Sequence, residues 1–67
     1  MNKRFQILLI GGCGDKRVGN VTRHCQIFRF RYIVQRDRKY ETCEDVYEVF
    51  VSATGARVGI YRETIAI

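Results

Sequence analysis

Apolar positions along the first half of the chain follow two patterns, and both predict strands. Residues 5–10 form an almost continuous apolar run that only Gln6 interrupts, which is typical of a strand covered on both faces. Residues 21–35 are β-branched and aromatic, and their period of two predicts one long strand. One face of that strand is predicted to be core and carries Phe28, Phe30, Tyr32 and Val34. The other face mixes arginine with isoleucine.

Residues 42–54 are rich in valine, yet their polar positions favour a helix. At 100° per residue, the acidic side chains and Ser52 fall within one narrow arc, and apolar side chains fill the rest. Thr42 fits an N-cap and Gly55 fits the position after the last helical turn. Three carboxylates, Glu44, Asp45 and Glu48, are then expected on an exposed helical face.

Residues 56–66 are predicted as a last strand, so the chain is expected to form one small α+β domain over residues 1–67. The expected order is β-β-α-β, in a three-stranded antiparallel sheet of order 2-1-3 with the helix packed on one face. The strand at residues 5–10 lies in the middle of that sheet. Its uncovered face is predicted to be apolar, which makes a homodimer one expected assembly. The residues expected there are Leu8, Ile10, Ile27 and Ile33.

Residues 11–20 hold four of the six glycines and are predicted to be a mobile hairpin loop. A dinucleotide-binding loop is disfavoured because Arg17 stands where the third glycine of the fingerprint belongs, and a strand follows. Residues 1–13 also resemble a bacterial lipoprotein signal that ends in "IGGC". The apolar run is shorter than is usual for such a signal, and processing at Cys13 stays open as an alternative.

The formal net charge of +5 is concentrated at one end of the chain. Lysine and arginine outnumber aspartate and glutamate by ten to two in residues 1–40, whereas residues 41–67 carry two against five. Such an asymmetry suits a partner with an acidic surface, either nucleic acid or protein, on the first half only.

The cations of residues 23–39 are predicted to form the main contact surface, joined by two from the glycine-rich loop. The arginines alternate with aromatic residues along the strand and so form a row on one of its faces. Such a row can hold phosphates without reading bases. The chain is therefore interpreted as a small, basic, non-enzymatic protein that binds nucleic acid or a nucleic-acid-processing complex. The predicted contact residues are Arg23, Arg29, Arg31, Arg36, Arg38, Lys39, Lys16 and Arg17.

Catalytic and metal-binding residues are not predicted. Three cysteines and His24 lack the closely spaced pairs that structural zinc sites use, and they are interpreted as small, half-buried side chains. No cofactor is expected. An odd number of cysteines suggests a reduced, cytoplasmic setting. No stretch approaches the roughly 20 apolar residues that a transmembrane helix needs.

"ETCEDVYEVF" and "TGARVGIYRE", within residues 41–62, resemble the helix and last strand of a phage-encoded inhibitor of bacterial RNA polymerase. The resemblance implies a helix there and an alternative function. In this alternative the chain is a phage-type inhibitor or adaptor that binds a host protein such as RNA polymerase, CRISPR or nuclease machinery. No site residue is carried over from the resemblance.

Overall fold

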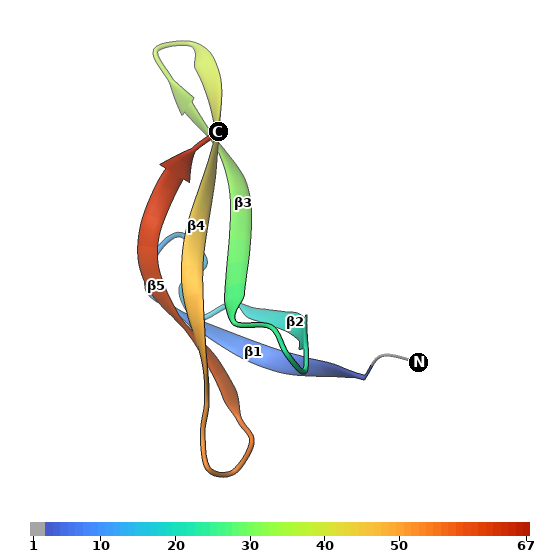
Figure 1. Ribbon diagram of the computed structural model, residues 1–67. Helices are drawn as coiled ribbons and strands as arrows, with labels where there is room; N and C mark the ends of the chain where they lie inside the picture. Colours follow the sequence, from blue (N-terminus) through green and yellow to red (C-terminus); the bar gives the residue numbers. More distant parts are fainter. Residues whose placement is uncertain (1–2) are drawn as a thin grey trace.

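The computed structural model describes residues 3–67 and is built from strands alone (Figure 1). Residues 1–2, which begin the lipoprotein-like segment, lie outside the described part of the chain. The strands are β1 (Arg4–Ile10), β2 (Val18–Thr22), β3 (Ile27–Arg36), β4 (Lys39–Val51) and β5 (Arg57–Ala66). The expected α+β fold is therefore wrong, and the protein is all-β within the described residues.

The predicted helix at residues 42–54 is instead most of β4. The alternation of a strand places Glu44 and Asp45 on opposite faces, where both are buried and each has a hydrogen-bond partner far away in the sequence. The valines and aromatic residues of this segment fit a pleated, half-buried surface. The tertiary partners of β4 thus outweigh the helical spacing of its acidic residues, and the helix implied by the phage-inhibitor resemblance is wrong too.

The single strand predicted over residues 21–35 is two strands with a turn between them. β2 ends at Thr22, whose carbonyl accepts a hydrogen bond from Cys25 N–H at 3.2 Å, and β3 begins at Ile27. The turn contains neither glycine nor proline, so its sequence gives little warning of it. The strand predicted at residues 5–10 is confirmed as β1.

The five strands form one nearly closed, barrel-like sheet of order β2-β1-β5-β4-β3, in place of the predicted three-stranded sheet. β1 is paired on both sides and is therefore an interior strand of the sheet, but only its Ile7 and Leu9 face is buried, so the predicted cover on both faces is absent from the described residues. Its pairing with β5 is parallel, whereas the sequence predicted an antiparallel last strand. The other three pairs are antiparallel, and a bulge interrupts the β4–β5 pair at Val46 and Tyr47.

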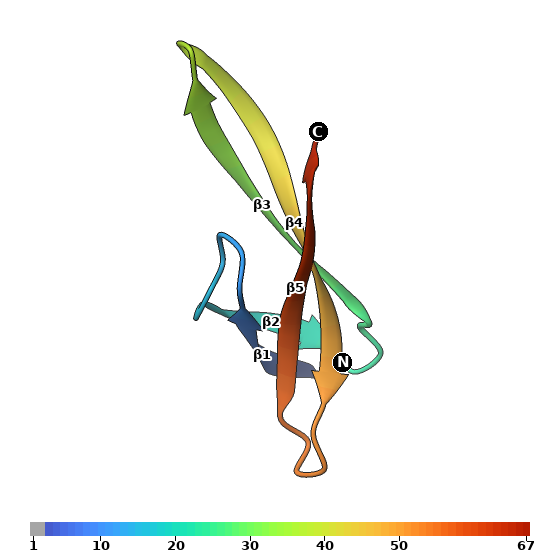
Figure 2. The ribbon, with the colours of Figure 1, turned by 90° about the vertical axis from the view of Figure 1, so that its left-hand side faces the viewer.

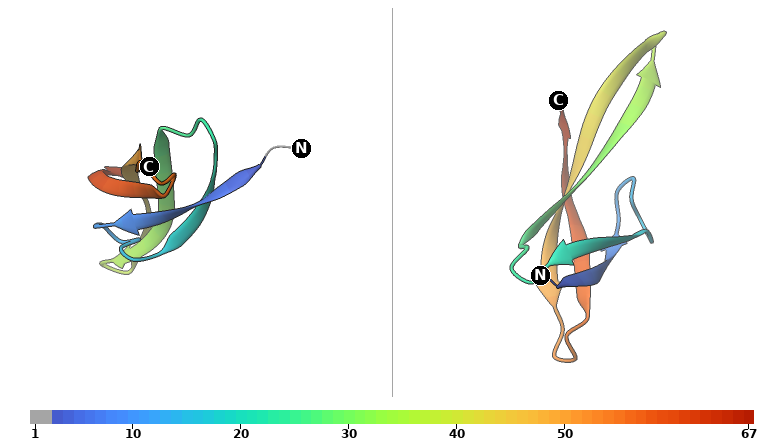
Figure 3. Two further views of the ribbon diagram at one scale, coloured as in Figure 1. Left: turned by 90° about the horizontal axis from the view of Figure 1, so that it is seen from below. Right: turned by 90° about the vertical axis from the view of Figure 1, so that its right-hand side faces the viewer.

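The core lies where β1 and β2 cross over the lower halves of β3, β4 and β5 (Figure 3). Ile7, Leu9 and Tyr47 are almost completely buried in it. The two edge strands, β2 and β3, meet at the open seam of the barrel, where the Phe28 ring of β3 packs against Gly19 of β2. A Cβ added at Gly19 would lie only 3.0 Å from that ring. Gly19 is therefore needed for close packing at the seam.

The β3–β4 hairpin extends well beyond this core (Figure 1). Its tip is a tight turn in which Asp37 and Arg38 have φ angles of 48° and 64°, as in a type I′ turn. Figure 2 and the right-hand view of Figure 3 show the hairpin leaning toward the side on which the glycine-rich loop rises. We call the face of the hairpin on that side its inner face, and the opposite one its outer face.

Candidate functional site

The predicted arginine row lies on the outer face of the hairpin, where a carboxylate neutralises part of its charge. Arg29 Nη1 lies 3.4 Å from Glu44 Oε1, and Arg31 Nη2 lies 3.1 Å from Glu44 Oε2. The Glu44 side chain is only 8% exposed, whereas both arginine side chains are about two-thirds exposed. Glu44 was predicted to be solvated on a helix, and it instead lies buried between the two arginines.

The remaining predicted contact residues are scattered over three places. Arg36 ends β3 and lies 3.9 Å from Glu41, which is a loose ion pair, while Arg38 and Lys39 form the hairpin tip. Arg23 lies in the turn after β2, away from this tip. Within residues 3–67, the predicted cations without an ion pair are Lys16, Arg17, Arg23, Arg38 and Lys39.

The inner face of the hairpin presents aromatic rings that the sequence assigned to the core. Phe30 does pack against the core, but it and Tyr32 are only half-buried, and their ring centroids lie 6.1 Å apart. Arg17, from the glycine-rich loop, places its guanidinium 5.5 Å from the Phe30 centroid. Alternation along β3 puts Val34 and Arg36 on the same face, nearer the tip. The structure thus brings Arg17 next to aromatic rings, whereas the sequence predicted cations and aromatic rings on opposite faces of the strand.

A buried carboxylate anchors the loop to this face. Asp45 is 1% exposed and accepts hydrogen bonds from Cys13 N–H at 2.7 Å, Thr64 Oγ1 at 2.7 Å and Tyr32 Oη at 2.9 Å. It therefore joins the glycine-rich loop, β3 and β5 to β4. Sequence reasoning placed Asp45 on a solvated helix, and only a strand assignment for this segment could have suggested its role.

The three hydrogen bonds hold Asp45 in its charged form. Burial alone raises the pKa of this carboxyl, but the hydrogen bonds from the Cys13 amide, Thr64 and Tyr32 together lower it below its ordinary value. The bond to Asp45 correspondingly raises the pKa of the Tyr32 phenol, with desolvation adding to the effect. Both groups are thereby kept in the protonation states that the hydrogen bond requires.

Tyr47 provides a second anchor for the loop. Its hydroxyl accepts a hydrogen bond from Gly14 N–H at 3.0 Å and donates one to the Gly11 carbonyl at 2.8 Å. Burial raises the pKa of this phenol, so it stays a donor at neutral pH. The hairpin turn predicted for the glycine-rich segment is confirmed, and residues 11–14 are tied to the sheet instead of standing free of it.

Glycine is required at position 12 by this anchoring. Gly12 has a φ of +66°, and a Cβ there would lie 2.6 Å from Tyr61 Cδ1 and 2.7 Å from Asp45 Oδ2. Either the backbone angle or the clash alone disfavours a side chain. The glycines that resembled a phosphate-binding loop therefore let the loop approach the sheet closely.

The cysteines and the histidine do not come together in a recognisable site. Cys13 is exposed, Cys25 is half-buried and Cys43 is buried, and all three thiols are free. In the described part of the chain, no three residues of the types that commonly ligate metals are grouped closely enough to hold an ion. The same part of the chain also contains no helix long and apolar enough to cross a membrane.

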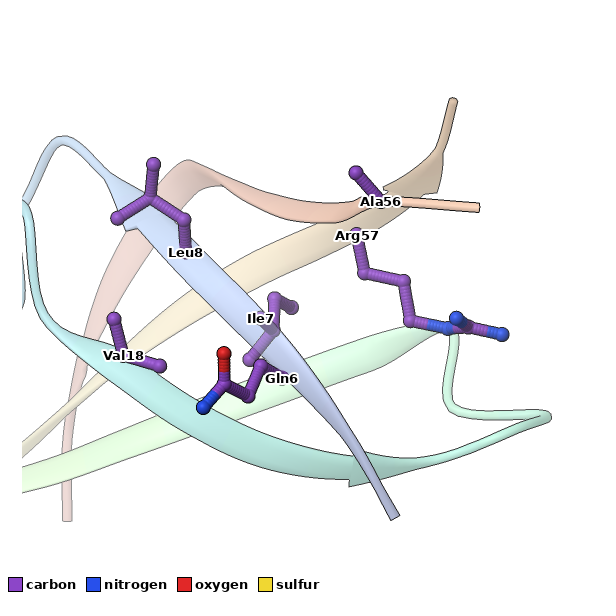
Figure 4. A pocket seen from close by; sticks show the side chains of 6 residues that line it. All are labelled: Gln6, Ile7, Leu8, Val18, Ala56 and Arg57. Atoms are coloured by element: carbon purple, nitrogen blue, oxygen red, sulfur yellow. The ribbon is translucent and has the colours of Figure 1, made fainter. Parts of the chain in front are cut away.

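A hollow of about 280 Å³ lies on the other side of the molecule, over β1 and β2 (Figure 4). Leu8 and Val18 line it, and Arg57 extends away from them toward its far side. The Arg57 guanidinium is engaged with a ring, because it lies 3.8 Å from the centroid of Phe5. The remaining lining residues are Gln6, Ile7 and Ala56. The hollow is mostly apolar and offers no pair of converging catalytic groups.

No protein family, no curated protein and no solved structure matches this chain. The functional argument therefore rests on the arrangement of its own residues.

Proposed function

We propose that this is a non-enzymatic protein that binds single-stranded nucleic acid through the inner face of the β3–β4 hairpin and the adjoining loop. The observation that carries the proposal is the stacking of Arg17 beside the half-buried ring of Phe30, with Tyr32 next to it. Single-stranded nucleic acids are held by aromatic rings that stack on bases and cations that meet phosphates on the same surface.

The distribution of charge favours the inner face over the outer one as the surface that binds nucleic acid. On the outer face, Arg29 and Arg31 share one buried carboxylate, so much of their charge is already compensated. Beneath the inner face lies the buried carboxylate of Asp45, which accepts hydrogen bonds from Cys13, Thr64 and Tyr32. The cations at the two ends of the inner face remain available for phosphates. They are Lys16 and Arg17 in the loop and Arg38 and Lys39 at the tip, joined by Arg36, whose ion pair with Glu41 is loose at 3.9 Å.

The shape of the hairpin also fits an extended ligand. Phe30, Tyr32 and Val34 lie two residues apart along β3, which spaces their side chains by about 7 Å. That is close to the spacing between bases in an extended single strand, whereas a duplex keeps its bases stacked and covered. A single strand laid along β3 can therefore place its bases on the rings and its phosphates near both groups of cations.

The proposal is tested by fluorescence anisotropy with labelled oligonucleotides of about 12 nucleotides, single-stranded and duplex, because binding domains of this kind cover about 4 to 16 nucleotides. Titrations at about 50 mM and 200 mM salt measure the phosphate contribution. We expect tighter binding to the single strands and a steep loss of affinity with salt. No binding at the lower salt concentration would contradict the proposal.

Substitutions on the two faces provide the matched comparison. F30L keeps an apolar side chain and removes the ring, and we expect it to weaken binding about tenfold, since one base stack contributes about 1 to 3 kcal/mol. R17Q is expected to weaken binding and reduce the salt dependence by about one phosphate contact. R31Q, on the outer face, is the control and is expected to change the affinity less than either. Equal losses in R31Q and R17Q would refute the inner face as the binding surface.

A further inference from the structure

The outer face of the β1–β5 pair is apolar and uncovered. In the parallel register Leu8 stands beside Val58, and Ile10 stands beside Ile60. Leu8 and Ile10 are 43% and 44% exposed, although the alternate residues of β1 are buried in the core. A parallel strand pair that is apolar on both faces is normally covered on both.

The apolar surface continues onto the neighbouring strands. Val18 of β2 is the register partner of Leu8 and is 61% exposed, and Phe50 of β4 is the register partner of Val58 and is 42% exposed. The hollow beside Leu8 and Val18 adjoins this surface (Figure 4). We call these residues the outer apolar patch: Leu8, Ile10, Val18, Phe50, Val58 and Ile60.

The charge around the outer apolar patch is balanced, unlike that of the whole chain. Glu48 is the register partner of Ile60, and its Oε1 forms an ion pair with Arg62 Nη2 at 2.7 Å. The Arg62 guanidinium also lies 5.9 Å from the Phe50 centroid. The patch itself holds no charged residue, so neither a phosphate backbone nor a strongly charged protein finds a complementary charge on it.

A second copy of the chain is the occupant that fits this neutral surface. In a two-fold dimer the same patch faces itself, and the rim pair can be exchanged so that Arg62 meets the partner's Glu48 without leaving a like charge opposed. The chain also gains stability from such a cover. Among residues 3–67 only six apolar residues are buried and the cysteines are free, whereas chains of this size commonly need additional stabilisation.

We propose that two copies associate through the outer apolar patch to form a two-fold dimer. The proposal does not depend on nucleic-acid binding, because the hairpin's inner face uses other residues. The sequence-based expectation also included Ile27 and Ile33, and the register does place Ile27 on this face, because it pairs with Glu48, the partner of Ile60. The proposed patch leaves both residues out. Those two residues lie on β3, the strand at the opposite edge of the sheet from β2.

Sedimentation equilibrium over a wide range of protein concentrations tests the dimer. I10K places a charge within the patch, beside Ile60, and we expect its dimer dissociation constant to rise at least about 100-fold, as for an unpaired charge in an interface. The control is I33K, because Ile33 is even more exposed, at 66%, but lies outside the patch. I33K is expected to dimerise like the wild type. V18K provides a second patch variant should I10K fail to give a folded spectrum by circular dichroism.

Three results would overturn the proposal. The first is a wild-type protein that stays monomeric up to submillimolar concentration. The second is a dimer that I33K disrupts and both patch variants leave intact. The third is a monomer that co-sediments with neutral phosphatidylcholine vesicles and loses that binding in V18K, because the patch would then face lipid.

Discussion

The two faces of the β3–β4 hairpin carry cations of the same kind and offer very different surfaces. On the outer face Arg29 and Arg31 converge on Glu44, so part of their charge is compensated within the protein. On the inner face Arg17 lies against Phe30 with no carboxylate partner, and Asp45 beneath it is fully engaged by neutral donors. The charge that a strand presents is decided by the residues across from it, and a count of cations along the sequence does not reveal it.

The largest expected loss of stability comes from a substitution at Gly12, where the glycine-rich loop approaches the sheet most closely. G12A would add a Cβ within 2.8 Å of three side chains at a φ of +66°, and we expect it to lower the free energy of unfolding by about 3 to 4 kcal/mol. G55A is the control, because Gly55 has a φ of +89° but nothing within 4 Å, and it should lose about 1 kcal/mol. Urea unfolding followed by tyrosine fluorescence measures both. Equal losses would mean that the loop does not approach the sheet as described.

The next largest effect compares the two buried carboxylates of β4. D45N removes the charge and one acceptor oxygen of a buried carboxylate and should destabilise the protein by about 2 to 3 kcal/mol, since the part-buried hydrogen bond from the Cys13 amide loses its charged acceptor. E44Q affects arginines that water can still reach, and we expect a loss below about 1 kcal/mol. The same unfolding assay measures both variants. A larger loss of stability in E44Q than in D45N would mean that Glu44, and not Asp45, is the carboxylate that stabilises the fold more.

Acid should lower the stability of the protein by protonating Asp45, which lies beneath the inner face. Its pKa is lower in the folded protein than in the unfolded chain, so its stabilising contribution is complete above the unfolded pKa and is lost as the pH falls through the folded one. We expect stability to decline below about pH 4, the ordinary range of an aspartate. Urea midpoints measured between neutral and acidic pH follow this decline. D45N should flatten the profile, and an unchanged profile in D45N would contradict the assignment.

The smallest effect sharpens the comparison in the binding assay. E44Q removes the carboxylate that compensates Arg29 and Arg31, so the outer face gains net positive charge. We expect single-stranded DNA to bind a few-fold more tightly to E44Q at low salt, with the gain screened at about 200 mM salt. Anisotropy titration of wild type and E44Q side by side provides the measurement. A weaker affinity in E44Q would mean that the Glu44 pairs help to form the binding surface.

The local features of this fold could be predicted from its sequence, and the long-range ones could not. The apolar run of β1, the glycine hairpin and the shared face of Phe28 and Phe30 follow from period and turn chemistry. The segment of β4 was misassigned because its acidic residues also fit a helical arc. The choice between the two depends on partners such as Cys13 and Arg31, more than ten positions away, which a local pattern does not contain.

The same limit applies to the candidate site. Phe30 and Tyr32 were expected to be buried because they alternate with arginine, and alternation does identify their common face. It does not show that β3 runs past the end of the core and leaves these rings half-covered. Nor does it show that Arg17, distant in sequence, lies over one of them. The lengths of paired strands and the path of the loop decide both points.

The parallel pairing of β1 with β5 determines when the sheet can be completed during synthesis. Ile7 stands beside Arg57, and these residues are 57 − 7 = 50 positions apart in the chain. Folding that depends on such distant contacts is slow and must bring the two ends of the chain together. β1 leaves the ribosome first and lacks one neighbour until the last strand has emerged. The apolar β1–β2 hairpin therefore lacks this neighbour until β5 has been synthesised.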